Sequence, residues 1–264
     1  MTDPVPERIS TPALDLAFHI APWDRAVLPG ESAVMTEIAL RDAGEATHAF
    51  HRFRDWCEAK NVVLVTARLA HGALREAGYL EAQGFRFIEL NYRPLLQDLS
   101  GFTADPAFTL RIATPADSAK IEGIAAQIFE AGRFHMDPYI GPEIGNRRYA
   151  LWAARAFANP SQQVLACEHE GRIAAFIVVE APEPETRFWS LVGLAPGLAG
   201  RGLGQRIWRA VLAHHASEGV TRVSTSISSH NGAAHNLYVS LGFRFPAPAM
   251  MLHWWRGAAA AQTL

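Results

Sequence analysis

Three glycines lie within five residues at Gly200-Arg201-Gly202-Leu203-Gly204, a spacing suited to the binding of an anion. The apolar stretch 187–194 precedes them, and residues 205–217 continue with apolar side chains at helical spacing. The glycines are therefore expected to join a strand to an amphipathic helix. Glycine lets the backbone approach a ligand closely, and the first turn of a helix offers unpaired N–H groups and a positive dipole end. The pattern predicts a pyrophosphate site, with an ordinary tight turn as the alternative.

Two other nucleotide-binding motifs do not fit this segment. A dinucleotide fingerprint needs a third glycine where Gln205 stands, and it follows the first strand of its domain, whereas other strands are expected before this one. A phosphate-binding P-loop needs Gly-Lys-Ser or Gly-Lys-Thr, which the chain lacks. The sequence therefore argues against NAD and against hydrolysed ATP as the ligand.

A second group of residues, 231–243, follows an alternating strand expected at 221–227. Asn231 is placed to cap a helix, and Gly242 is placed to end it. Tyr238 falls on the apolar face of this helix. It is either a core tyrosine with a satisfied hydroxyl or a proton donor in a site.

Composition limits the classes of function. The formal net charge is −2, so no global field attracts nucleic acid or an anionic membrane, and no apolar run is long enough to cross a bilayer. Cys57 and Cys167 form no Cys-x-x-Cys motif, and the histidine pairs at 48/51 and 230/235 lack a carboxylate at ligand spacing. We expect a folded cytoplasmic protein without a metal.

Two domains are expected, an α/β domain at 1–100 and a second domain at 107–257, joined by a Pro-, Ser- and Gly-containing stretch without periodicity. The first contains expected helices at 46–60 and 74–83 and strands at 61–68 and 85–92. The second begins with a strand at 108–112 and a helix ending near Phe129. Further elements are a helix at 147–158, a hairpin turning at Glu170-Gly171 and a strand at 187–194.

One four-residue string occurs in both halves. Gly84-Phe85-Arg86-Phe87 and Gly242-Phe243-Arg244-Phe245 are identical, and each follows an expected helix and opens an expected strand. Either the halves are related by duplication or two unrelated units coincide. Nothing before residue 80 is similar to residues 200–204, the glycine segment. A duplicated first half would therefore lack the anion-binding site expected there.

The segments 194–204 and 231–243, with a helix and a strand between them, resemble the motifs of the GNAT superfamily of acetyl-CoA-dependent N-acetyltransferases. The resemblance covers residues 108–255, and the first hundred residues would be a degenerate GNAT-like copy. It implies an α/β (α+β) fold with a central mixed, mostly antiparallel sheet flanked by helices. Ala199 stands where the family usually has Gln or Arg, so the contact of that side chain is missing.

The resemblance also implies roles for individual residues. The amides of Gly200, Arg201, Gly202, Leu203 and Gly204 would hold the pyrophosphate of acetyl-CoA. Main-chain groups near Gly193 and Leu194 would pair with the pantetheine arm where the sheet splays apart, and Gly193 suits such a bulge or opening of the strand. Asn231 would touch the same arm, and Tyr238 would protonate the departing thiolate.

A closer resemblance, to dTDP-fucosamine acetyltransferases, rests on residues 131–140, Tyr149-x-x-Trp152 and Trp254-Trp255-Arg256. It implies an acceptor site, and a solvated loop is the alternative. The expected acceptor-binding residues are Arg133, Phe134, His135, Asp137 and Tyr139. The group that deprotonates the acceptor amine stays open between Glu180, His230 and a water chain.

The sequence thus predicts an enzyme that acetylates a primary amine on a small molecule, with a nucleotide-linked amino sugar as the leading acceptor. A peptide, polyamine or drug amine is the second choice. A non-catalytic acyl-CoA sensor is the alternative from another class of protein. The sequence leaves the oligomeric state open, with a homodimer as one alternative.

Overall fold

The computed structural model describes residues 5–198, 200 and 202–257, which form two compact units. Unit 1 comprises Tyr92–His135 and Gly145–Pro246. Unit 2 comprises residues 5–91, Met136–Ile144 and 247–257. The expected second domain, 107–257, therefore has to be corrected, because two of its segments belong to the unit that contains the first ninety residues.

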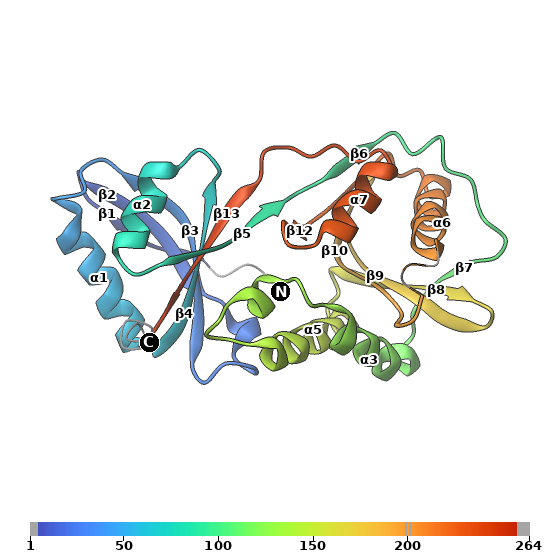
Figure 1. Cartoon of the computed structure of the whole chain (residues 1–264), viewed down its shortest axis with the longest axis horizontal. Helices are drawn as coiled ribbons and strands as arrows, with labels where there is room; N and C mark the ends of the chain where they lie inside the picture. Colours follow the sequence, from blue (N-terminus) through green and yellow to red (C-terminus); the bar gives the residue numbers. More distant parts are fainter. Residues whose placement is uncertain (1–4, 199, 201, 258–264) are drawn as a thin grey trace. The chain divides into compact units, whose positions relative to one another are not determined.

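Unit 1 is a mixed sheet with helices on both faces (Figure 1). Its strands lie in the order β6-β11-β10-β9-β8-β7; the β10–β11 pair is parallel and the other described pairs are antiparallel. The strands are β6 (Leu95–Gln97), β7 (Thr109–Ile112), β8 (Gln162–His169), β9 (Arg172–Glu183), β10 (Thr186–Leu194) and β11 (Arg222–Thr225). The short strand β12 (Ile227–Ser228) is not part of this sheet. The helices of this unit are η2 (Pro115–Asp117), α3 (Ser118–Ile128), α4 (Arg133–Met136), α5 (Pro142–Ala156), α6 (Leu203–Ser217) and α7 (Gly232–Ser240). Each of them has most of its residues in unit 1.

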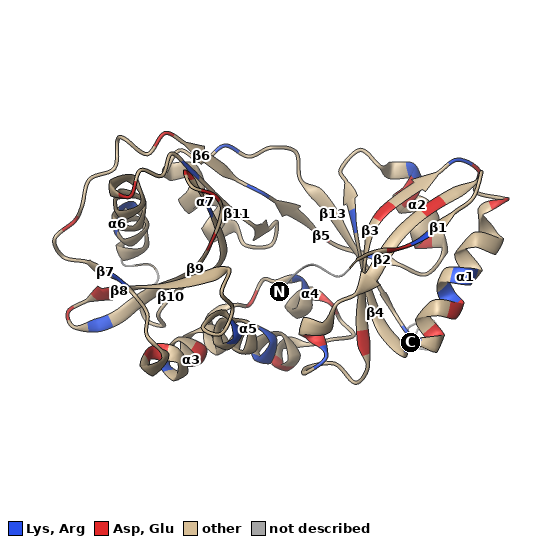
Figure 2. Cartoon of the chain, turned by 180° about the vertical axis from the view of Figure 1, so that it is seen from behind, with Lys and Arg blue, Asp and Glu red and all other residues tan. Residues whose placement is uncertain are grey.

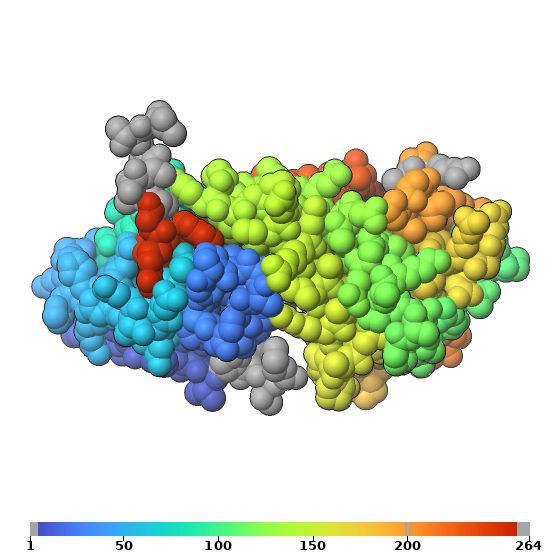
Figure 3. Space-filling model, turned by 90° about the horizontal axis from the view of Figure 1, so that it is seen from below, coloured from blue at the N-terminus to red at the C-terminus, as the bar shows by residue number. Residues whose placement is uncertain are grey.

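The central strand β9 is buried on both faces because its side chains alternate between two apolar cores. Ile177 and its neighbours at alternate positions pack with α6 and α7, whereas Phe176 and Val178 pack with α3 and α5. In Figure 3, the side chains of α3 and α5 cover much of the second face. Glu170 and Gly171, both with positive φ, form the tight turn between β8 and β9 that the sequence predicted. The expected α/β fold with a mixed, mostly antiparallel sheet and flanking helices is confirmed.

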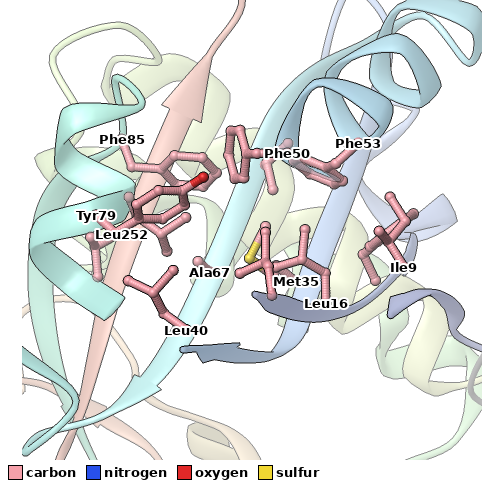
Figure 4. Close-up of a cluster of buried hydrophobic side chains, with 14 of the residues drawn as sticks. Ile9, Leu16, Met35, Leu40, Phe50, Phe53, Ala67, Tyr79, Phe85 and Leu252 are labelled. Atoms are coloured by element: carbon pink, nitrogen blue, oxygen red, sulfur yellow. The ribbon is translucent and has the colours of Figure 1, made fainter. Parts of the chain in front are cut away.

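Unit 2 is a second mixed sheet, with strands in the order β1-β2-β3-β4-β13-β5. The β3–β4 pair is parallel. The elements are β1 (Glu7–Ser10), β2 (Leu14–Ile20), η1 (Pro22–Asp24), β3 (Glu31–Leu40), α1 (Ala46–Ala59), β4 (Val62–Ala70), α2 (Leu74–Ala82), β5 (Arg86–Tyr92) and β13 (Ala249–Trp255). One face of the sheet carries α1 and α2, and Figure 4 shows Phe50 and Phe53 of α1 and Tyr79 of α2 over strand residues such as Met35. Figure 2 shows basic and acidic residues interspersed over both units.

The last strand of the chain, β13, lies between β4 and β5 in unit 2. Its Leu252 is 1% exposed and joins the apolar core of that unit. On the same strand, His253 Nδ1 lies 2.6 Å from Asp137 Oδ2, and both side chains are buried. These two contacts explain why residues 136–144 and 247–257 belong to unit 2.

The two units share an order of elements. In unit 1, β10, α6 and the parallel strand β11 are followed by α7 and Gly242; in unit 2, β3, α1 and the parallel strand β4 are followed by α2 and Gly84. Both glycines have positive φ, 86° at Gly84 and 87° at Gly242. In each unit, a strand from a distant part of the chain then pairs with the second parallel strand, β6 with β11 and β13 with β4.

A buried histidine in unit 1 makes stability depend on pH. Trp189 Nε1 donates to His215 Nε2 at 3.1 Å, and burial lowers the pKa of His215 from 6.5 to about 4. The folded chain therefore binds fewer protons than the unfolded chain between these values. We expect the free energy of unfolding to fall as the pH drops from about 6.5 to about 4, by about 3 kcal/mol from this group.

Urea unfolding between pH 7 and pH 4 measures this effect. His215→Gln keeps an acceptor for Trp189 but does not titrate, so its stability should depend less on pH than that of the wild type. His230→Gln, at an exposed position, is the matched control and should keep the wild-type dependence. Equal pH dependence in the His215→Gln variant and the wild type would contradict the assignment.

Candidate active site

A cleft of about 560 Å³ opens in unit 1 between the end of α3, the second half of β10, the glycine segment and the first turns of α7. Most of the predicted coenzyme and catalytic residues line it: Gly193, Leu194, Gly200, Gly202, Gly204, Asn231 and Tyr238. Leu203 does not line the cleft, since its half-buried side chain packs against the apolar core. Arg201 and Ala199 lie outside the described residues.

The glycine segment presents backbone to the cleft at the start of α6. Gly200 and Gly202 have φ of 76° and 72°, in the left-handed region that favours glycine. Gly202 is the N-cap of α6, and among the described residues other than its chain neighbours, no atom lies within 4 Å of the place where its Cβ would be. The first turn of α6 therefore meets open space, with the positive end of the helix dipole beside it.

Strand β10 separates from its parallel neighbour inside the cleft. The β10–β11 pairing ends at Trp189 opposite Thr225, while pairing with β9 continues to Leu194. The edge of β10 beyond Trp189 is thus open to a ligand that pairs with main-chain groups.

The register of β10 against β9 shifts between Thr186 and Phe188 and again between Trp189 and Leu191, so neither bulge lies at Gly193. Gly193 instead lies in the part of β10 that has separated from β11, the opening that was the other expectation. Gly193 keeps regular register with Phe176. A Cβ at this position would lie 2.3 Å from Ile128 Cδ1, so close packing by α3 explains the glycine.

Tyr238 is 1% exposed and borders the interior of the cleft. Trp208 Nε1 donates to its Oη at 3.3 Å. Burial raises the pKa of Tyr238 to about 12, although hydrogen bonds with Trp208 and Thr225 act in the opposite direction. The phenol therefore keeps its proton at neutral pH.

Asn231 caps α7 as predicted, because its Oδ1 accepts a hydrogen bond from the Ala234 N–H at 3.0 Å. This bond fixes the side chain at the cleft wall. The side-chain NH₂ of Asn231 is the group left to donate to a ligand.

Sequence reasoning missed several cleft residues. Ile128, Phe129 and Glu130 line the cleft from the end of α3, and Gln205 and Trp208 line it from α6. In the sequence, the types and spacing of these residues indicate only a helix or its end, not a binding site. Only the packing of α3 against β10 places them at a site.

Two of the expected acceptor residues do not reach the cleft. Phe134 and Asp137 are buried, and neither lines the cleft. Asp137 bonds to His253 and accepts the Tyr139 N–H at 2.9 Å, which gives it a structural role. Arg133, His135 and Tyr139 are half-buried, and none of them lines the cleft.

Neither candidate base lies on the cleft wall. Glu180 Oε1 accepts a hydrogen bond from Gln162 at 2.7 Å, and His230 is exposed beside Asn231.

Among the described residues, no group of three His, Cys, Asp or Glu could hold a metal ion, and no helix is long and apolar enough to cross a membrane. Burial raises the pKa of Cys57 and of Cys167 to about 12, so neither thiol is a ready nucleophile.

The segment 132–152 supports the cleft wall through stacked rings. Tyr149 stacks on Phe129 with ring centroids 4.0 Å apart, and His135 and Trp152 stack on Tyr149 in turn. Gly132 leaves room for this column, since its Cβ would lie 2.2 Å from Tyr149 Oη. The aromatic residues noted in the sequence thus hold the end of α3 in place.

Comparison with known proteins agrees with this geometry. Residues 130–243 match the Acetyltransferase (GNAT) family. The L-2,4-diaminobutyric acid acetyltransferase of Nocardia farcinica is 30% identical over 162 residues, which cover 56% of this chain and 80% of that protein. The chain belongs to the GNAT family of N-acetyltransferases.

Two further similarities extend over both units of this GNAT enzyme. The spore coat polysaccharide biosynthesis protein SpsD of Bacillus subtilis is 18% identical over 93% of this chain and 85% of its own length. A tandem GNAT protein from the clavulanic acid biosynthesis pathway has a similar fold, with a TM-score of 0.58 and 16% identity over 94% of this chain and 85% of that one. The fold shared with a tandem protein spans unit 1 and unit 2.

Proposed function

We propose that this GNAT enzyme binds acetyl-CoA in the cleft of unit 1 and transfers the acetyl group directly to a primary amine. One observation carries the proposal. Residues from two separate motifs, Gly200 to Gly204 and Asn231 to Tyr238, line one cleft together with the open edge of β10. This edge offers main-chain groups to an amide-containing arm, and the start of α6 offers an anion site.

In this proposal, the dipole of α6 and main-chain hydrogen bonds hold the coenzyme in the cleft. Gly200, Gly202 and Gly204 line the cleft at the start of α6, and their amides would hold the pyrophosphate. Gly193 and Leu194 on the open edge of β10 would pair with the pantetheine arm, with Asn231 on the opposite wall. Arg201, whose charge the sequence places at the same turn, stays a prediction.

Tyr238 is proposed as the general acid. The amine nitrogen forms a bond to the acetyl carbon and gives up a proton to water, the carbon–sulfur bond breaks, and the sulfur receives the proton of Tyr238 Oη, which Tyr238 regains from water. A pKa of about 12 keeps the donor protonated, and a cleft that buries the phenol also disfavours the thiolate. Both features favour proton transfer to sulfur as the thiolate leaves.

A nucleotide-linked amino sugar is proposed as the acceptor. The similarity to SpsD, a protein named for polysaccharide biosynthesis, extends over 93% of this chain and supports this substrate class. The similarity to an enzyme that acetylates diaminobutyric acid favours a free amino acid as the second candidate.

Acceptor profiling decides between these candidates. Purified enzyme with acetyl-CoA is offered dTDP- and UDP-linked 4-amino-4,6-dideoxy sugars, L-2,4-diaminobutyrate, polyamines and peptides, and release of free coenzyme A is measured. We expect the nucleotide sugars to be turned over with the highest kcat/KM. Turnover of diaminobutyrate, polyamines or peptides with every nucleotide sugar inert would overturn the proposed acceptor.

Unit 2 is proposed to be a degenerate copy that does not bind the coenzyme. The order of elements it shares with unit 1 supports the duplication. At the start of α1, Asp42 Oδ1 accepts the N–H groups of Gly44 and Glu45 at 2.8 and 3.0 Å. A carboxylate of the chain itself thus occupies the position where unit 1 would hold a phosphate.

A further inference from the structure

The cleft of unit 1 carries one carboxylate among its described residues. The ionisable side chains that line it are Glu130 and Tyr238; the other described lining residues are apolar, glycine or neutral amides. Glu130 is the second residue after the end of α3 and is exposed. Its charge therefore dominates the local field on that wall of the cleft.

A carboxylate on this wall opposes the binding of an anionic coenzyme. Pyrophosphate and carboxylate repel each other, and the repulsion is stronger in a cleft than in open water. A primary amine, in contrast, carries a positive charge at neutral pH until it is deprotonated for attack. The charge of Glu130 thus suits the acceptor and not acetyl-CoA.

The two residues before Glu130 are held by packing. Ile128 packs so closely on β10 that its Cδ1 lies 2.3 Å from a Cβ built at Gly193. Phe129 stacks on Tyr149 with an interplanar angle of 17°. Two packed neighbours restrict where the Glu130 carboxylate can reach, which a binding group for an oriented amine requires.

We infer that Glu130 binds the ammonium group of the acceptor and orients its nitrogen toward the acetyl carbon. The inference rests on the proposed coenzyme site, because the cleft has to hold acetyl-CoA for the acceptor to meet it. It makes Glu130 a specificity-determining residue for cationic acceptors. No part of it depends on which amine is the natural substrate.

A pair of coenzyme A derivatives tests the inference without a known acceptor. S-(2-Aminoethyl)-coenzyme A places an ammonium near the position of the attacking nitrogen, and S-propyl-coenzyme A is its uncharged counterpart. Calorimetry with the full chain gives the Kd of each. We expect the wild type to bind the cationic derivative about tenfold more tightly.

Three variants test whether the preference for the cationic derivative depends on the carboxylate of Glu130. Glu130→Gln should bind both derivatives equally, and Glu130→Asp should keep part of the preference. Glu143→Gln, at an exposed position away from the cleft, should keep all of it. For any acceptor found by profiling, Glu130→Gln should raise KM about tenfold with a smaller change in kcat.

An unchanged preference in the Glu130→Gln variant would overturn the role of Glu130 and leave the coenzyme site standing. Failure of the folded wild type to bind either derivative would overturn the coenzyme site itself, and the inference with it. Since the two failures give different measurements, they can be told apart.

Discussion

Replacement of Gly202 by glutamate is expected to abolish acetyl-CoA binding. The N-cap of α6 has a φ of 72°, and its Cβ position opens on free space in the cleft. A side chain there would therefore enter the volume assigned to the pyrophosphate. Its carboxylate would repel the phosphates and compete for the same amides, as Asp42 does at the start of α1 in unit 2.

The expected result is a rise in Kd for acetyl-CoA of at least about 100-fold by calorimetry, with the protein still folded. Gly219→Glu is the matched control, because Gly219 has a φ of 81°, also has free space at its Cβ position and lies just beyond the opposite end of α6. Both variants place a glutamate in a left-handed conformation, so both should lose similar stability. Unchanged acetyl-CoA affinity in folded Gly202→Glu would remove the assignment of the pyrophosphate site.

Local patterns predicted the glycine turn, the helix cap and the buried tyrosine at the cleft. The positive φ at Gly202, the helix cap at Asn231 and the burial of Tyr238 are properties of short segments, and glycine, asparagine and apolar spacing report on such segments directly. The order of strand, glycine turn and helix then brings the two motifs together, because parallel strands β10 and β11 place the following loops at one edge of the sheet.

The acceptor side was predicted poorly because its contacts are not local. Asp137 looked like a polar group for a substrate, but its partner His253 lies 116 residues further along the chain. The pairing of β13 with β4 and β5 is likewise invisible in the sequence of 249–255. The partners of a strand depend on tertiary packing, and the residue types within the strand do not identify them.

Replacement of Tyr238 by phenylalanine is expected to lower kcat by about 10²- to 10⁴-fold while Kd for acetyl-CoA changes little. The variant keeps the ring that packs on Phe243, at a centroid distance of 4.9 Å, and deletes the hydroxyl that Trp208 contacts. The fold and the cleft should therefore persist. Tyr92→Phe, which makes the same change outside the cleft, is the matched control and should keep the wild-type rate.

The pH dependence of kcat provides an independent readout of the same role. A general acid acts only while protonated, so activity that depends on Tyr238 is lost as the pH rises through its pKa of about 12. We therefore expect no alkaline loss from this group below about pH 10. Single-turnover measurements isolate the chemical step from product release. If the phenylalanine variant completes that step at the wild-type rate, sulfur receives its proton from another donor, and the cleft would then act through binding and orientation alone.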